Sequence, residues 1–223
     1  MSGEDPRRGE GAASAAVRTG ISRSSASLGT ASFHTCCREK VMACHPESLS
    51  TAGVQGSRLV VVLGGSADPL AAAQQLAGRF GPGPVVVGHA VADLHTAAPS
   101  AAAALAGLRA APAWPDAPRP VLAAELLPER ALDGDEAARD ELLADVYEPM
   151  LRGGAALVET VTTYLEQGFS LEAAARQLFV HPNTVRYRLR RVSELTGLTA
   201  TSGRSGFTLW VAIVLGRLVH KRT

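Results

Sequence analysis

Arginine, amide, hydroxyl and phenol side chains follow one another closely between residues 183 and 191. An asparagine amide can pair bidentately with adenine, an arginine can pair with guanine, and a threonine methyl group can contact thymine. Arginines that do not reach a base can neutralise phosphates, which adds affinity without reading sequence. The candidate base-contacting residues are Asn183, Thr184, Tyr187 and Arg188, and the candidate phosphate-contacting residues are Arg186, Arg190 and Arg191. A solvated basic helix that binds nothing is the alternative interpretation.

Apolar spacing predicts two short helices that present these groups. Apolar residues recur at i, i+3, i+4 and i+7 in the first helix, and at i, i+4 and i+7 in the second. They are Leu171, Ala174, Ala175 and Leu178, then Val185, Leu189 and Val192. Only residues 179–181 lie between the two patterns, so we expect a tight turn there. The pair then forms a helix-turn-helix, in which the start of the second helix enters the major groove of DNA.

The ends of these helices carry local signals. Ser170 is expected to cap the first helix, and Pro182 suits the first position of the second, where a missing N–H costs nothing. Gly197 follows the last residue of the second helix. An apolar stripe over residues 157–165 predicts a preceding helix that ends at Gly168. Together these helices can enclose a small core.

The C-terminal third resembles the helix-turn-helix of PucR-type (purine-catabolism-regulator-like, CdaR-related) bacterial transcription regulators, over the stretch LVETVTTYLEQGFSLEAAARQLFVHPNTVRYRLRRVSELTGL. It is also similar to the Fis-type reader. The matching residues are Tyr164-Leu165, Ala174-Ala175, the run His181 to Leu189, Arg190-Arg191 and Glu194 to Gly197. The resemblance implies a DNA-binding regulator and extends over about residues 58–220.

One position of the turn departs from the resembled pattern. Many such motifs have a small residue or glycine there, whereas this chain has Phe179. A bulky residue disfavours a positive φ angle. We therefore expect either a turn that avoids this conformation or a Phe179 that a neighbouring domain buries.

The net charge of +1 hides a strong asymmetry along the 223 residues. Residues 58–151 carry six Lys/Arg and twelve Asp/Glu, whereas residues 182–223 carry eight Lys/Arg and one Asp/Glu. The C-terminal end is therefore expected to bind polyanions. The chain has no apolar run of about twenty residues, so we expect no membrane span.

Residues 58–151 alternate between strand and helix patterns, which predicts an α/β module. Strands are expected over 59–63, 84–88 and 121–123, the first of them buried on both faces. Helices are expected over 68–80, 93–111 and 135–150, with Asp68 capping the first. Leu142, Leu143, Val146 and Met150 form the expected buried stripe of the last helix. The resemblance implies a truncated cyclase-like middle domain that regulates or dimerises without catalysis.

Catalytic patterns in this module are weak. The loop Gly64-Gly65-Ser66 could cradle a phosphate before a helix, but it lacks the P-loop and dinucleotide signatures, so a structural turn is favoured. His89 and His95 bracket Asp93 without a nucleophile elbow. The acidic residues between Glu125 and Glu136 are interpreted as a solvated face. We expect neither a cofactor nor enzyme activity.

Residues 1–57 are rich in Ser, Gly, Ala, Thr and Arg, and no apolar period holds, which predicts a disordered tail. Cys36, Cys37 and Cys44 lie near histidines there, and reduced thiols are favoured over a metal site because adjacent cysteines do not fit C-x₂-C spacing. Arg7-Arg8 precede no apolar segment, so we expect no export signal and a cytoplasmic location. A truncated or shifted start is a further hypothesis for this region.

These patterns predict a disordered tail (1–57), an α/β regulatory or dimerisation module (58–151) and an all-α, Fis-like helix-turn-helix domain (152–223). We expect a cytoplasmic transcription regulator of metabolic genes that binds double-stranded DNA as a homodimer and responds to a small-molecule effector. The last helix, beginning near Phe207, is expected to close the core, with a dimer contact as the alternative. Two other hypotheses stay open: an α/β enzyme or nucleotide-binding protein with a basic end, and a fragment of a larger regulator.

Overall fold

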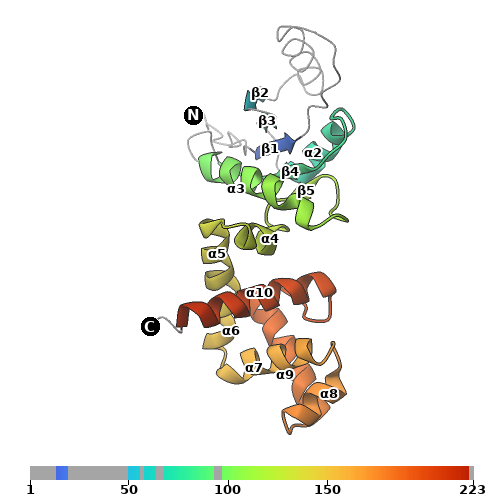
Figure 1. Ribbon diagram of the computed structural model, residues 1–223, viewed down its shortest axis with the longest axis vertical. Helices are drawn as coiled ribbons and strands as arrows, with labels where there is room; N and C mark the ends of the chain where they lie inside the picture. The colour runs from blue at the N-terminus through green and yellow to red at the C-terminus, as the bar shows by residue number, and fades with distance from the viewer. Residues whose placement is uncertain (1–13, 20–49, 56–57, 64–67, 93–96, 221–223) are drawn as a thin grey trace, which may run out of the picture. The chain divides into compact units, whose positions relative to one another are not determined.

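The computed structural model describes residues 14–19, 50–55, 58–63, 68–92 and 97–220. The chain divides into two compact units, one ending at Glu129 and the other beginning at Arg130. Figure 1 shows the strands gathered in the first unit and helices alone in the second. An α/β module followed by an all-α helix-turn-helix region is the fold class that the sequence predicts.

The first unit is organised around a five-stranded sheet with the order β2-β3-β1-β4-β5. Its strands are β1 (Ser14–Thr19), β2 (Ser50–Gln55), β3 (Arg58–Leu63), β4 (Val85–Val87) and β5 (Val121–Leu122). Strand β3 pairs antiparallel with both β1 and β2, and β1 pairs antiparallel with β4. Only the β4–β5 pair is parallel among the described strands.

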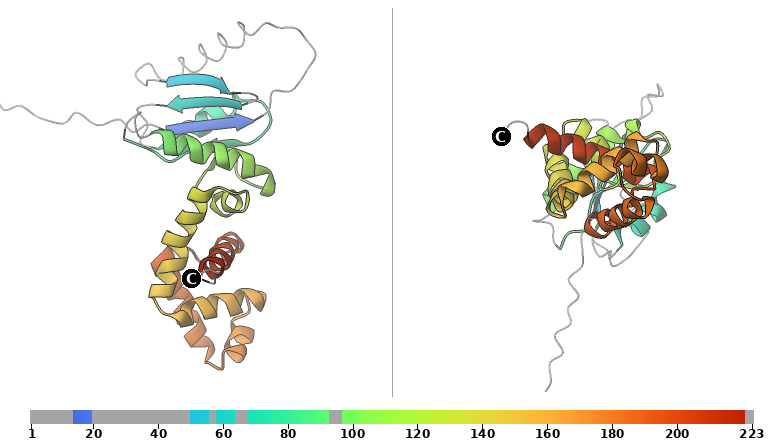
Figure 2. Two further views of the ribbon diagram at one scale, coloured as in Figure 1. Left: turned by 60° about the vertical axis from the view of Figure 1, so that its left-hand side comes forward. Right: turned by 90° about the horizontal axis from the view of Figure 1, so that it is seen from below.

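Two helices pack on this sheet. Helix α2 (Pro69–Ala77) contacts β4, and helix α3 (Ala97–Ala110), followed by the short 3₁₀ turn η1 (Ala111–Ala113), contacts β1 and β4. Figure 2 shows α3 lying across one face of the strands. One buried core of this unit comprises Val86, Ala104, Leu108, Ala111, Val121, Ala123 and Leu126, with Trp114 packed against it. Strands β4 and β5, helix α3, η1 and the segment after β5 thus supply this core.

Several predicted elements of the first unit are confirmed. Strands β4 and β5 form where the short apolar runs indicate, and Asp68 caps α2 by accepting hydrogen bonds from the amides of Leu70 and Ala71, both at 3.0 Å. Helix α2 ends at Ala77, three residues earlier than predicted. The described part of α3 begins at Ala97, and the predicted start at residue 93 lies outside the described residues.

Two expectations about the N-terminal part need correction. Most of the predicted tail lies outside the described residues, but β1 and β2 fall within it and are strands. Main-chain pairing with β3 builds them, and such pairing requires no run of apolar side chains. The sequence predicts a β3 that is buried on both faces, yet only Val61 is buried and its other five residues are half-buried. Cys36, Cys37, Cys44 and residues 64–66 also lie outside the described residues.

The second unit is all-helical. Its elements are α5 (Glu136–Leu142), the π-helical turn η2 (Leu143–Tyr147), α6 (Glu148–Arg152), α7 (Ala155–Glu166), α8 (Leu171–Gln177), α9 (Pro182–Thr196) and α10 (Gly203–His220). Helix α4 (Leu127–Leu132) spans the boundary between the units. The largest fully buried side chains of this unit are Leu142, Met150, Leu209 and Ile213. Apolar faces of α5, α6 and α10 thus supply its centre.

The helix predicted over residues 135–150 forms, but it is not a regular α-helix throughout. Its middle five residues follow the π-helical pattern, in which an N–H bonds five residues back and the turn is wider. Leu142, Val146 and Met150 are buried as predicted, whereas Leu143 is half-buried. Segment η2 packs against α10, so this helix belongs to the second unit rather than to the α/β module in which its sequence pattern is expected.

The acidic stretch around residues 125–136 is not simply a solvated face. Glu129 is buried, and the carboxylate of Asp135 lies 2.8 Å from a terminal guanidinium nitrogen of Arg130, which is itself almost fully buried. Asp135 also caps α5 by accepting from the amide of Ala138 at 3.4 Å. Composition alone does not reveal which carboxylates of such a run acquire an internal partner.

Helix α10 closes the core of the second unit, as expected. It begins at Gly203, four residues before the predicted start near Phe207, because two glycines there weaken the helix signal. Gly206 lies directly against Phe169, since a Cβ at this position would come 2.9 Å from Cε1 of that ring. Arg217 of α10 donates to the hydroxyl of Thr162 at 3.0 Å, which ties α10 to α7.

Candidate nucleic-acid interface

Helices α8 and α9 form the predicted helix-turn-helix. The Ser170 hydroxyl caps α8 by accepting from the amide of Ala173 at 3.2 Å, which confirms the expected cap. Ala174 and Ala175 are buried, so the two helices can cross closely. After α8 the chain turns, and the amide of Val180 donates to the carbonyl oxygen of Ala175 at 3.0 Å.

Phe179 occupies the turn in the conformation that a bulky residue disfavours. Its φ angle is +55°, so the turn does adopt the left-handed conformation. Its residue surface is 95% exposed, so the helices of the second unit do not cover it. A non-glycine residue in this region carries conformational strain that no packing of the side chain offsets.

Helix α9 begins with an arrangement that the sequence predicts only in part. Pro182 occupies the first turn, as predicted, and Gly197 ends the helix with a φ of +72°. The cap itself is His181, whose Nδ1 accepts a hydrogen bond from the amide of Asn183 at 3.2 Å. The sequence-based prediction places His181 in the turn and assigns it no function. Its position directly before Pro182 is the sequence feature that could have indicated a helix cap.

The buried residues of α9 define its opposite, outer face. Val185, Leu189 and Val192 are buried against the other helices. Because successive residues of an α-helix are about 100° apart, the outer face carries Asn183, Tyr187, Arg190 and Glu194, with Arg186 and Arg191 on its flanks. Tyr187 is 69% exposed, and Arg186 donates to Oδ1 of Asn183 at 2.6 Å. Amide, phenol and guanidinium groups therefore share one solvent-facing surface.

Arg188 points elsewhere. It lies on the side of α9 that faces α7, is half-buried, and donates from Nη1 to the hydroxyl of Thr160 at 3.0 Å. The same hydroxyl donates to the carbonyl oxygen of Ala156 at 2.6 Å, and Thr160 is fully buried. The candidate residues consequently separate: the outer face gathers Asn183, Arg186, Tyr187, Arg190 and Arg191, Thr184 is half-buried beside it, and Arg188 is bound to α7.

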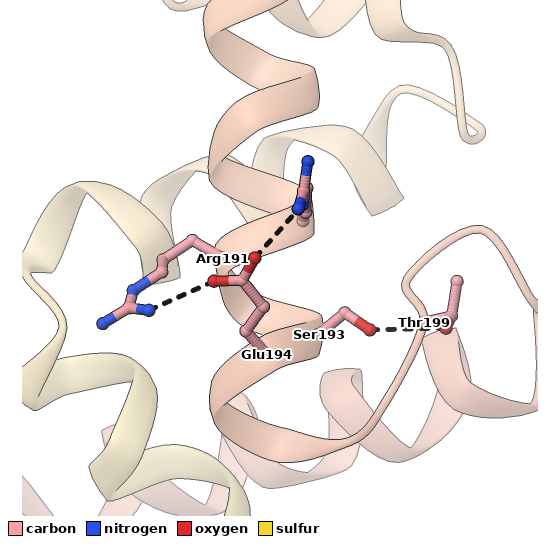
Figure 3. Close-up of polar contacts among 5 residues, drawn as sticks. Arg191, Ser193, Glu194 and Thr199 are labelled. Atoms are coloured by element: carbon pink, nitrogen blue, oxygen red, sulfur yellow. Dashed lines mark hydrogen bonds and ion pairs between the residues drawn. The ribbon is translucent and has the colours of Figure 1, made fainter.

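Arg190 and Arg191 share one carboxylate, a pairing that the sequence-based prediction does not include. Arg190 Nε donates to Oε1 of Glu194 at 3.1 Å, and Arg191 Nη1 donates to Oε2 of Glu194 at 3.1 Å. Figure 3 shows Glu194 turned toward the guanidinium of Arg191, with Ser193 and Thr199 linked just beyond it. The hydrogen bonds from Arg191 and then Arg190 hold the pKa of Glu194 below its usual value. Glu194 lies three residues after Arg191 and four after Arg190, and this helical spacing is the sequence feature that could have indicated the pairing.

Comparison with known proteins places this site in a family. Residues 157–215 match the family model described as the PucR C-terminal helix-turn-helix domain. The crystal structure of a regulator of polyketide synthase expression from Bifidobacterium adolescentis superposes with a TM-score of 0.75 and 32% sequence identity, covering 94% of this chain and 82% of that one. The chain belongs to the PucR-type transcription regulators.

Sequence relatives extend the similarity beyond the PucR-type helix-turn-helix. An uncharacterized protein of Mycobacterium tuberculosis is 45% identical over 166 residues, which is 74% of this chain and 40% of that protein. The purine catabolism regulatory protein of Bacillus subtilis is 35% identical over 63 residues, 28% of this chain and 12% of that protein. This PucR-type chain thus spans less than half the length of the curated relatives that it matches.

Metal-binding and catalytic groupings were the other kinds of site considered from the sequence of this PucR-type protein. Within the ranges that the structure describes, no three His, Cys, Asp or Glu side chains are grouped so as to hold a metal ion. The carbonyl oxygen of His89 accepts a hydrogen bond from Ser100 at 2.7 Å, while Asp93 and His95 lie outside the described residues. None of the described helices is both long and apolar enough to traverse a bilayer.

Proposed function

We propose that this chain recognises specific double-stranded DNA sites by placing the outer face of α9 in the major groove. The observation that carries this proposal is the exposed surface at the start of α9, where Asn183 and Tyr187 stand beside Arg186 while the apolar side packs inward. The start of a recognition helix lies deepest in the groove, so groups there can reach base edges. The excess of positive charge over residues 182–223 supports attraction to DNA.

The geometry supports a division of labour among the seven candidate residues. Asn183, Thr184 and Tyr187, with Arg186 beside them, are proposed to face bases. Arg190 and Arg191, further along α9, are proposed to contact phosphates, where they add affinity without sequence preference. For Arg188 we propose a positioning role, because its hydrogen bond to Thr160 joins the recognition helix to α7.

A homodimer is part of the proposal. One recognition helix reads a short stretch of bases, and two-fold DNA sites are bound by two-fold proteins. Helix α10 leaves a stripe of apolar side chains exposed: Phe207 at 38%, Val214 at 41% and Leu218 at 56%. Such a stripe supports pairing of two copies through α10. Analytical sedimentation of wild type and of Leu218→Asp, compared for their oligomeric state, tests this pairing.

The regulated genes are proposed to be metabolic, because a relative named as a purine catabolism regulatory protein shares the helix-turn-helix. We propose that the α/β module has no catalytic activity. It binds a small-molecule effector, and this binding changes the DNA affinity of the helix-turn-helix. A cytoplasmic location follows from this role. Measuring effector-dependent shifts in DNA affinity with purines and related metabolites tests the assignment directly.

The test of DNA recognition is a selection from random duplexes with the full chain, followed by affinity measurements against salt. We expect an enriched site and a steep salt dependence. Asn183→Ala should cost about 1–3 kcal/mol on the selected site and little on scrambled DNA. Arg191→Ala should weaken binding without changing which bases are preferred, and should flatten the salt slope by about one unit. Absence of any enriched site would refute sequence-specific recognition.

The role of Arg188 has its own pair of variants. If Arg188 positions α9, Arg188→Ala and Thr160→Val should each lower the affinity for the selected site without changing which bases are preferred. Their effects should also be non-additive, since both remove one hydrogen bond. A relaxed base preference in Arg188→Ala alone would show that Arg188 reads a base.

A further inference from the structure

Glu194 is the one acidic residue in the strongly basic sequence from residue 182 to residue 223. It stands on the outer face of α9, in line with Asn183, Tyr187 and Arg190. Its side chain is 45% exposed. One of its oxygens is bound by Arg190 and the other by Arg191, and the contact with Arg191 can be followed in Figure 3. A negative charge therefore sits within the surface that is proposed to face DNA.

Helix stability does not account for this carboxylate. Glu194 lies in the last turn of α9, where the negative end of the helix dipole disfavours an acidic side chain. In both ion pairs the arginine precedes the glutamate, which is the less favourable order along a helix. Exposed ion pairs of this kind contribute little to folding in any case.

The two ion pairs instead restrict the movement of the two arginine side chains. Without Glu194, each guanidinium would move freely at the end of a long side chain and could follow phosphates at many positions. Bound to Glu194, both guanidinium groups are held at 3.1 Å from one carboxylate and occupy a defined place beside α9. A phosphate elsewhere is reached only by breaking these hydrogen bonds, and the carboxylate itself repels phosphate.

We propose that Glu194 is a specificity-determining residue that restrains Arg190 and Arg191 and thereby suppresses binding to DNA of arbitrary sequence. Non-specific binding depends almost entirely on interactions with phosphates at shifting positions, so it loses most from this restraint. On a correct site, α9 is fixed by base contacts and the phosphates lie where the restrained arginines already point. The inference rests on the proposed function, because it assigns a role within the same DNA surface.

The experiment compares Glu194→Gln with wild type, using the full chain, the selected duplex and a scrambled duplex across a salt series. We expect Glu194→Gln to bind scrambled DNA about two- to fivefold more tightly, as the loss of an exposed ionic interaction implies. The salt slope on scrambled DNA should steepen, by up to about 0.9 for each additional phosphate that the protein neutralises. Affinity for the selected duplex should change by less than about twofold, so the specificity ratio falls.

Glu141→Gln is the matched control, because Glu141 is an exposed carboxylate on α5 and its replacement changes the net charge equally. Equal increases in affinity for scrambled DNA in both variants would reduce the effect to net charge and overturn the inference. If Glu194→Gln changed the affinity for the selected and the scrambled duplex by the same factor, the inference would be overturned as well. Failure of wild type to select any site would instead refute the proposed function, so the two failures are distinguishable.

Discussion

Replacing Phe179 by glycine is expected to stabilise the second unit. Phe179 has a φ of +55°, and for an L-residue the left-handed conformation costs about 1–2 kcal/mol. Glycine avoids that cost but loses more backbone entropy on folding, about 0.5–1 kcal/mol. Because the residue is 95% exposed, no packing is sacrificed, and the net gain should be about 0.5–1 kcal/mol.

Phe169 provides a matched control within the same unit. Its φ is +65°, so glycine should relieve the same strain there. Its ring, however, packs edge-on against Tyr164 with 5.7 Å between ring centroids, and the residue is only 45% exposed. Loss of the aromatic pair and of half a buried ring costs about 1.5–2.5 kcal/mol, so Phe169→Gly should destabilise by about 1 kcal/mol net.

The assay is urea unfolding of the full chain in a Trp114→Phe background, in which the fluorescence of Trp210 on α10 reports the second unit alone. We expect the unfolding midpoint to rise for Phe179→Gly and to fall for Phe169→Gly. Midpoints that move in the same direction, or an unchanged midpoint for Phe179→Gly, would refute the strain argument. A loss of DNA affinity in Phe179→Gly would show instead that the exposed ring contacts DNA.

Three further predictions use the same readout or a variant of it. Ser170→Ala removes the cap of α8 and should destabilise the second unit by about 1 kcal/mol. Gly216→Ala introduces a Cβ that overlaps the ring of Tyr147, so overpacking should cost about 1–3 kcal/mol in the urea experiment. Since Arg191 lowers the pKa of Glu194, the stabilisation it gives is present at neutral pH and is lost as pH falls through that lowered pKa. The difference between the midpoints of wild type and Glu194→Gln should therefore be small and should vanish on acidification, and a difference that persists once Glu194 is protonated would contradict this sign.

Elements whose formation depends on local signals were predictable from the sequence. The positions of α8 and α9 follow from apolar residues repeated at helical spacing, and their ends follow from Ser170, Pro182 and Gly197. In each case the physical cause lies within a few residues of the effect: a hydroxyl that accepts from a nearby amide, or a glycine that takes a positive φ. Asp68 at the start of α2 is a third example.

Features that depend on distant partners were not predictable in this way. The orientation of Arg188 is set by Thr160, which lies 28 residues away on α7. Burial of Glu129 and pairing of Arg130 with Asp135 require knowledge of what packs over them. Strands β1 and β2 form through main-chain pairing with β3, which leaves little trace in the types of their side chains.

The π-helical turn η2 lets the second unit hold one additional residue without a change of helical phase. A π turn contains one residue more than an α turn, so deleting one residue, such as exposed Ala144, would let the segment close as regular α-helix. Because the deleted residue is the one that the wider turn accommodates, the residues after it would keep their faces relative to α5. Met150 would stay in the core and Tyr147 would stay beside Gly216. Deletion of Ala144 should therefore be tolerated better than deletion of a residue from a regular α-helix of this unit, which would rotate everything after it by about 100°.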